Sequence, residues 1–165
     1  MRQPTAPFRI DPHLIAALLA AVPVWAALGL WAGPWLRAPA GAWGWFSLVL
    51  LMPLLEEWVF RGLLQGQLLR VTQAHGQPRR WGPVTWANGL TTLAFVALHL
   101  PTQPLLWALS VAAPSLVLGH LRERLGSVWP AIGVHVVYNA GFALHCLGER
   151  QPGVWEGSTG GLGWV

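Results

Sequence analysis

Three ionisable residues stand close together inside one apolar stretch of the sequence: Glu56, Glu57 and Arg61. Leucines at 63, 64, 68 and 69 continue the apolar character beyond these charges. A charged group at the centre of a bilayer costs roughly 2.5–3.5 kcal/mol on insertion scales. Three such groups in an apolar helix are therefore expected to be paired or to carry out chemistry, which makes them the first candidates for a catalytic site.

Helical spacing separates the two carboxylates. Glu57 and Arg61 are four residues apart, so they share a helix face and can form an ion pair. Glu56 is rotated about 100° from Glu57 and lies outside that pair. We therefore predict that Arg61 neutralises and orients Glu57, while Glu56 faces a cavity as the reactive carboxylate. The alternative is a helix end at the membrane interface with solvated charges, and the leucines that follow Arg61 argue against it.

Two later apolar stretches also carry groups that exchange protons or donate hydrogen bonds. One stretch ends at His99, and another contains His135 and Asn139, which are four residues apart on one helix face. Each has a structural alternative, because a lone histidine is more often a hydrogen-bonded structural residue and a His/Asn pair can bridge two helices. Together with the glutamates they place polar groups on three helices, which is the convergence that a buried catalytic site needs.

The composition predicts that these helices lie in a membrane. Of the 165 residues, 54% are hydrophobic and only 10% are charged, whereas a typical soluble domain has about 25% charged residues. The twelve tryptophans agree with this prediction, since Trp is enriched at bilayer interfaces. The arginines form no basic stripe with interleaved aromatics, so no nucleic-acid partner is expected.

Five apolar segments come close to the roughly 20 residues that a helix needs to cross a bilayer. They are residues 13–36, 42–69, 82–100, 104–121 and 128–147. With the N-terminus inside, the cytoplasmic side would hold Arg2, Arg9, Arg70, Arg79, Arg80, Arg122 and Arg124. The outer side would hold only Arg37 and Arg150, so the arginine bias favours this orientation. We expect an all-α, polytopic transmembrane helical bundle, with one domain over residues 1–147 and a short Gly-rich tail over residues 148–165.

One candidate does not fit these boundaries. Glu56 and His135 are expected roughly 21 Å and 12 Å from opposite membrane faces, which are compatible depths. His99, however, stands at the outer end of the third segment. Either that helix starts later, near Asn88, or the break at residues 101–104 lies below the membrane surface in a protein-lined cavity.

The ordered set Glu-Glu-x-x-x-Arg, Phe-x-x-x-His and His-x-x-x-Asn on successive helices resembles the motifs of the CPBP family. These are the CAAX-protease and bacteriocin-processing membrane peptidases, also called Abi or Rce1-like, or glutamic-type intramembrane proteases. Residues 119–130 are similar to the connection before the family's last motif, and the resemblance covers about residues 45–145. It implies an intramembrane endopeptidase of the bacterial cytoplasmic (inner) membrane.

The resemblance also implies a role for each candidate. Glu56 would be the base that activates the attacking water, and His99 would assist it. The neighbouring carboxylate–arginine pair would support that base, while His135 and Asn139 would stabilise the oxyanion and position the substrate carbonyl. Two histidines and a glutamate also match a catalytic zinc site, so a zinc-dependent version through Glu56, His99 and His135 stays open. The absence of an H-E-x-x-H helix favours glutamate catalysis without a cofactor.

The partners implied are the lipid bilayer and a membrane-associated protein or peptide substrate. CAAX-type, leader-peptide and C-terminal sorting-tail processing all fit the resemblance. The alternative function is a non-catalytic membrane immunity or scaffold protein that uses the polar cluster for packing. The sequence makes no prediction about the oligomeric state.

Overall fold

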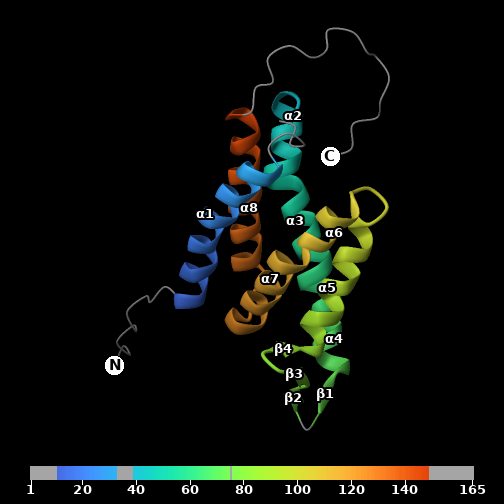
Figure 1. Cartoon of the computed structure of the whole chain (residues 1–165). Coiled ribbons are helices and arrows are strands. Elements are labelled where there is room, and N and C mark those ends of the chain that lie inside the picture. The colour runs from blue at the N-terminus through green and yellow to red at the C-terminus, as the bar shows by residue number, and fades with distance from the viewer. Residues whose placement is uncertain (1–10, 33–38, 75, 149–165) are drawn as a thin grey trace.

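The computed structural model describes residues 11–32, 39–74 and 76–148. Five helical segments make up most of this part of the chain (Figure 1). In order they are α1 (Pro12–Ala32), a long helix over residues 41–71, α5 (Trp86–His99), the pair α6 (Leu105–Ser110) and α7 (Ala112–Leu125), and α8 (Trp129–Gly148). They overlap the five predicted segments, and the predominantly helical fold that was predicted is confirmed. The tail beyond Gly148 lies outside the described residues.

The long helix is α-helical at its ends and in its middle. These parts are α2 (Gly41–Phe46), α3 (Met52–Glu57) and α4 (Gln65–Val71). Two π-helical stretches, Ser47–Leu51 and Trp58–Leu64, join them without interrupting the helix. π turns change which side chains face a neighbour and are frequent at functional sites. Here they lie on either side of the two glutamates.

Two small β-hairpins connect the long helix to α5, where none was predicted. Strand β1 (Gln73–Ala74) pairs antiparallel with β2 (Gln77–Pro78), and β3 (Arg80–Trp81) pairs with β4 (Val84–Thr85). The predicted helix start at residue 82 is therefore wrong. Gly82 has φ +59° and is followed by Pro83, which suits a turn. The helix begins only after Thr85, whose hydroxyl accepts the backbone N–H of Asn88 as an N-cap.

The fourth predicted segment also differs from the helices that the structure shows. A turn at Val111 separates α6 from α7, close to Pro114, which has no N–H to give to the preceding helical turn. At its other end α7 continues past the predicted limit to Leu125. It stops where Gly126 adopts a left-handed conformation with φ +67°, a common way to end a helix.

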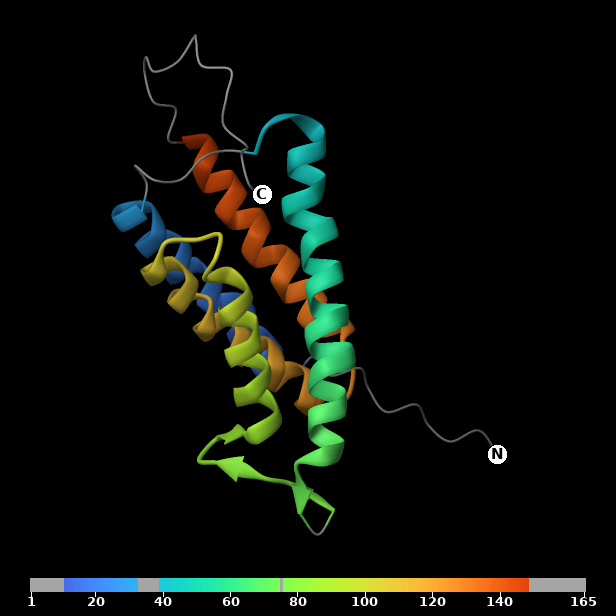
Figure 2. The same cartoon turned by 90° about the vertical axis from the view of Figure 1, so that its right-hand side faces the viewer.

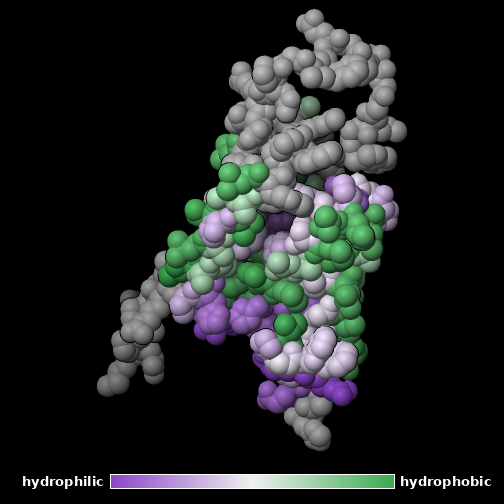
Figure 3. Space-filling view, in the orientation of Figure 1, coloured by the Kyte–Doolittle hydropathy of each residue, from purple (hydrophilic) through white to green (hydrophobic). Residues whose placement is uncertain are grey.

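Several polar side chains, charged ones among them, are buried and many large apolar side chains are exposed, which is unusual for a soluble protein. The buried polar residues are Ser47, Glu57, Arg61, Gln65, Thr85, Asn88, Thr91, Thr92, Ser115 and His135. Leucines on all five helical segments are exposed at the outer surface, for example Leu19, Leu63 and Leu93, each about two-thirds exposed. Figure 3 shows this apolar band, with hydrophilic residues at the lower end of the molecule. This pattern is the one that a lipid environment favours, since lipid solvates leucine and does not solvate a charge.

One helical stretch among the described residues, Leu105–Leu125, is by itself long and apolar enough to cross a membrane. It comprises α6, the turn at Val111 and α7. The charges of the candidate site interrupt the apolar character of the long helix, and α5 has only 14 residues. The predicted five-span topology with the N-terminus inside therefore stays a prediction.

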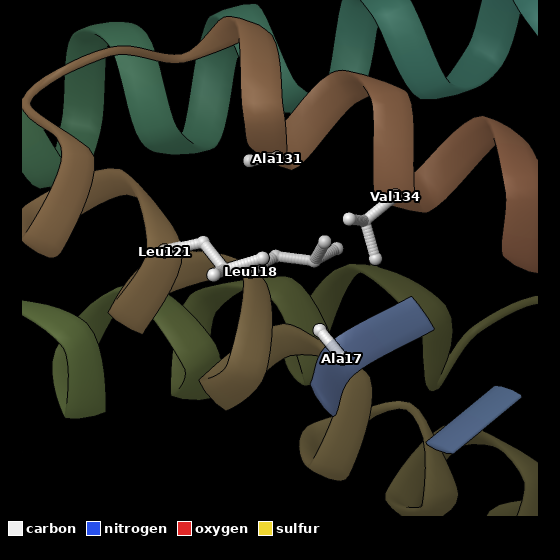
Figure 4. Close-up of a cluster of buried hydrophobic side chains, with 5 residues drawn as sticks. All are labelled: Ala17, Leu118, Leu121, Ala131 and Val134. Carbon is white, nitrogen blue, oxygen red and sulfur yellow. The ribbon is translucent and has the colours of Figure 1, made fainter. Parts of the chain in front are cut away.

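Two hydrogen bonds show how the long helix and α7 are oriented relative to each other. Arg61 bonds to Ser115 and Gln65 bonds to Gly119, each pair 54 residues apart, so the long helix and α7 run parallel. A small apolar cluster joins α1, α7 and α8 (Figure 4): Ala17, Leu118, Leu121, Ala131 and Val134. Polar contacts thus hold α7 to the long helix, while apolar packing holds it to α1 and α8.

At Gly119, α7 packs directly against α5. A Cβ added there would clash with Asn88 Oδ1, and Asn88 is fixed because its amide donates to the Leu116 carbonyl at 3.0 Å. We expect Gly119→Ala to lower the free energy of unfolding by about 1–3 kcal/mol through overpacking. Gly133→Ala is the matched control, because a Cβ there meets open space. Thermal unfolding in detergent measures both, and equal melting temperatures for the two variants would contradict this packing.

Candidate active site

Glu57 is the centre of a buried charge cluster. Its carboxylate has no exposed side-chain surface, and Oε1 lies 3.0 Å from Arg61 Nη1. The same oxygen lies 2.9 Å from His135 Nδ1 on α8. A carboxylate only accepts, so His135 Nδ1 carries a proton and donates it to Glu57. The pairing of Glu57 with Arg61 predicted from helical spacing is therefore present, and it also fixes His135.

Arg61 is held by two further helices. Its Nη2 donates to the Ser115 carbonyl at 3.1 Å and to the Ser115 hydroxyl at 2.8 Å. That hydroxyl also lies 2.9 Å from the hydroxyl of Thr92 on α5. The guanidinium stacks 4.8 Å from the centroid of the Phe95 ring, a cation–π contact. The position of Arg61, and so that of Glu57, therefore depends on α5 and α7.

Glu56 is much less constrained than its neighbour. Its side chain keeps 18% of its surface exposed, and Oε2 lies 3.8 Å from His135 Nε2. That separation is too long for a direct hydrogen bond and suits a bridging water. The predicted division between a fixed Glu57 and a freer Glu56 is thus seen in the contacts.

His99 lies beside the cluster despite standing at the end of α5. Its ring packs 4.6 Å from the Phe95 ring, which in turn lies 6.5 Å from the His135 ring. His99 also lies near Glu56. The long helix extends well beyond the end of α5 (Figure 2), so the end of α5 meets it partway along. This arrangement accounts for the depth that the predicted boundaries left unexplained.

The tautomer of His99 follows from its hydrogen bond. His99 Nδ1 lies 2.8 Å from the Phe95 carbonyl oxygen. A carbonyl can only accept, so Nδ1 carries the proton and Nε2 of the neutral ring presents a lone pair. His99 therefore has one nitrogen positioned by its own helix and one available to a water or substrate.

Asn139 is placed on α8 one turn beyond His135, with its amide toward the long helix. Asn139 Nδ2 donates to the Leu48 carbonyl at 2.9 Å. In the π-helical stretch the N–H of Met52 bonds to the Ser47 carbonyl, five residues earlier. Pro53, next along, has no N–H to give to the Leu48 carbonyl. Asn139 satisfies that acceptor and keeps a second amide N–H for another partner.

Three residues of this site, Ser115, Thr92 and Gln65, escaped prediction from the sequence, and Phe95 had no predicted role although it opens the Phe-x-x-x-His motif. Ser115 anchors Arg61, Thr92 contacts the Ser115 hydroxyl, and Phe95 stacks on Arg61. One helical turn after Arg61, Gln65 donates to Glu123 at 2.8 Å. Hydroxyls in apolar helices usually satisfy their own backbone, so Ser and Thr give no distinctive signal. Gln65 lies four residues after Arg61, and that helical spacing was the one available signal.

The metal alternative has a limited structural basis. No group of three or more His, Cys, Asp or Glu side chains is arranged to hold a metal ion in the described part of the chain. His135 Nδ1 is engaged by Glu57 and His99 Nδ1 by a backbone carbonyl. The two Nε2 atoms and the Glu56 carboxylate are the donors that remain. Their chemistry suits zinc, but no zinc geometry follows from their positions.

The sequence matches one protein family, described as type II CAAX prenyl endopeptidase Rce1-like, over residues 38–141. No curated protein and no solved structure matches the chain. The matched region is well over half of the chain and contains all six predicted site residues. The chain therefore belongs to the Rce1-like family of endopeptidases.

Proposed function

We propose that the protein is an intramembrane endopeptidase that hydrolyses a peptide bond of a membrane-associated protein or peptide. One observation carries the proposal: adjacent glutamates have different environments. Glu57 is enclosed and bound to Arg61 and His135, whereas Glu56 is partly exposed and faces the second nitrogen of the same histidine. This is the arrangement that separates a catalytic base from the group that supports it.

In the proposed reaction, Glu56 removes a proton from a water held between its carboxylate and His135 Nε2. The resulting hydroxide attacks the substrate carbonyl carbon and forms a tetrahedral oxyanion. Glu56 then returns the proton to the leaving amine as the C–N bond breaks. One glutamate thus acts first as base and then as acid, and the step needs no further reactant besides water.

Oxyanion stabilisation is assigned to α8. If His135 carries a second proton, its Nε2–H can donate to the oxyanion while Glu57 supports the positive ring through Nδ1. Glu56 is protonated at that stage, so the Glu57 carboxylate and the oxyanion balance Arg61 and the imidazolium, and the zero net formal charge suits a low-dielectric site. Asn139 supplies its second amide N–H. Donors fixed on helices in this way contribute to catalysis because they need no reorganisation.

His99 is proposed to position the water. Its proton on Nδ1 is committed to the Phe95 carbonyl, so Nε2 can accept a hydrogen bond from the water that Glu56 deprotonates. The Phe95 ring packs against the His99 ring and also contacts the Arg61 guanidinium. This packing helps to fix the position of the His99 ring.

Metal removal tests the metal-free version of the mechanism. We expect purified enzyme to retain its cleavage rate within about twofold after treatment with 1,10-phenanthroline, because the proposed base and donors are all protein groups. A thermolysin control in the same detergent verifies chelation. Loss of cleavage that added Zn²⁺ restores would instead establish the zinc-dependent alternative through Glu56, His99 and His135.

The substrate class is proposed from the family, with CAAX-type, leader-peptide and C-terminal sorting-tail processing as the candidates. The test compares the termini of membrane-associated proteins in cells that express the wild type with those in cells that express Glu56→Gln. A peptide that is processed only with the wild type identifies the substrate and the cleaved bond. The non-catalytic scaffold alternative predicts identical termini in both cells, which would reject the proposal.

A further inference from the structure

Two cavities adjoin one another at the arginine-rich end of the molecule, away from the Glu56 cluster. The first, of about 400 Å³, lies between α1, α5 and α7. The second, of about 420 Å³, lies between α4, the hairpins and the end of α7. Both are lined by His120 and Glu123, so the two cavities share a wall.

The second cavity has the chemistry of an anion site. Arg80, Arg122 and Arg124 line it together with one acid, Glu123. That acid is engaged elsewhere, since Glu123 Oε1 accepts from Gln65 at 2.8 Å and from the Thr85 hydroxyl at 2.5 Å.

The three arginines are not equally available to a ligand. Arg124 is paired with Asp11, whose two oxygens lie 3.0 and 2.9 Å from its Nε, and this hydrogen bonding lowers the pKa of the Asp11 carboxyl. Arg122 has a buried Nε with no hydrogen-bond partner in the described residues. Arg80 is exposed, and its one bond to the Pro83 carbonyl is long, at 3.3 Å. Among the described residues, Arg80 and Arg122 are therefore the arginines of this cavity that have no acidic partner.

The first cavity is lined mainly by apolar groups. Three alanines of α1 form one side, Ala16, Ala17 and Ala20, and Leu116, Val117 and Leu121 of α7 form another. Near the shared wall, the ring centroids of His13 and His120 lie 5.1 Å apart, and His13 Nδ1 lies 3.1 Å from His120 Nε2. An apolar cavity thus borders the cavity that holds Arg80 and Arg122.

We propose that the two cavities together bind one anionic phospholipid, with its headgroup phosphate on Arg80 and Arg122 and an acyl chain along the alanines of α1. A soluble anion would use only the basic cavity, whereas a lipid uses both. The position also suits a lipid, because the hydrophilic lower end meets the apolar band at this level (Figure 3). Basic pockets between helices at the cytoplasmic side are known binding places for anionic headgroups.

The headgroup is tested on the purified full-length chain in detergent by native mass spectrometry and thermal unfolding. We expect phosphatidylglycerol to bind at least tenfold more tightly than phosphatidylcholine and to raise the melting temperature. Each basic side chain near a membrane surface contributes about fivefold to such binding. Arg80→Gln with Arg122→Gln should therefore weaken phosphatidylglycerol binding by about 25-fold.

The matched control is Arg70→Gln with Arg79→Gln, which removes the same charge from exposed arginines that line neither cavity. It should leave phosphatidylglycerol binding within about threefold of the wild type. Equal weakening in both double variants would overturn the site, since only general attraction would then remain. If the double variant at Arg80 and Arg122 does not fold, Arg80→Gln alone, at an exposed position, carries the test with an expected fivefold loss.

The acyl-chain half has its own test. Ala20→Phe fills the first cavity, whereas Leu19→Phe adds a ring at an exposed position outside it. Ala20→Phe should weaken binding of long-chain phosphatidylglycerol at least tenfold, and Leu19→Phe should not. Glycerol 3-phosphate is the soluble probe: if it stabilises the chain as well as the lipid does, the site binds a free phosphate and the lipid proposal is wrong. None of these readouts depends on proteolysis, so the result is independent of the proposed function.

Discussion

Glu56→Gln is expected to lower the rate of peptide-bond cleavage by roughly 10²–10⁴-fold, the range for loss of a general base. The amide has nearly the shape of the carboxylate but cannot accept the proton of the attacking water. Stability should hardly change, because the nearest ionic partner of Glu56, His135 Nε2, is 3.8 Å away and the side chain is partly exposed. Cleavage of the identified substrate in proteoliposomes, together with the melting temperature, measures both effects.

Glu57→Gln is the matched comparison, one position along the same helix. Its carboxylate is fully enclosed and bound to both Arg61 and His135, so we expect it to lose stability as well as activity. The two variants should therefore differ clearly in melting temperature. If Glu56→Gln unfolds and Glu57→Gln stays stable but inactive, the roles assigned to the two glutamates must be exchanged.

Arg61→Met is expected to lower the free energy of unfolding by about 3–5 kcal/mol, the typical effect of breaking a buried ion pair. The substitution leaves the enclosed carboxylate of Glu57 without its 3.0 Å partner. It also leaves Ser115 without the guanidinium that its carbonyl and hydroxyl bind. Chemical unfolding in detergent measures the loss, and an unchanged midpoint would show that the pair does not support the fold.

A double variant separates the charge effect from packing. Glu57→Leu combined with Arg61→Met replaces both charges by apolar groups, which often restores stability to a buried pair. We expect most of the loss to be recovered while cleavage stays abolished, because His135 would have no carboxylate to orient it. Recovery of cleavage in the double variant would mean that the ion pair has no part in the reaction.

The approximate helix positions could be predicted from the sequence because each helical segment carries a long apolar stretch. The charges at Glu57 and Arg61 stood out against that signal, and their spacing was enough to predict a shared face. The contacts between helices could not be predicted in the same way. Nothing in the sequence shows that His135 Nδ1 would bond to Glu57 and thereby turn Nε2 toward Glu56.

Local backbone geometry accounts for the remaining differences. A two-residue strand is too short to show the alternation of polar and apolar residues, so the hairpins at residues 73–85 could not be recognised from the sequence. The turn at Gly82–Pro83 was therefore included in the third predicted helix. The π turns likewise have no distinctive composition. In the π-helical register the Leu48 carbonyl would accept from residue 53, which is a proline without an N–H, so it accepts from Asn139 instead. This contact could be recognised only in three dimensions.

The most direct test of the central claim is to measure substrate cleavage in H₂¹⁸O by the wild type and by Glu56→Gln in proteoliposomes. The two enzymes are first shown to have the same melting temperature. The mechanism predicts that the wild type places one ¹⁸O in the new C-terminal carboxylate at each cleavage, since water is the nucleophile. It predicts essentially no labelled product from Glu56→Gln over the same time. Labelled product from Glu56→Gln at the wild-type rate would contradict the assignment of Glu56 as the base.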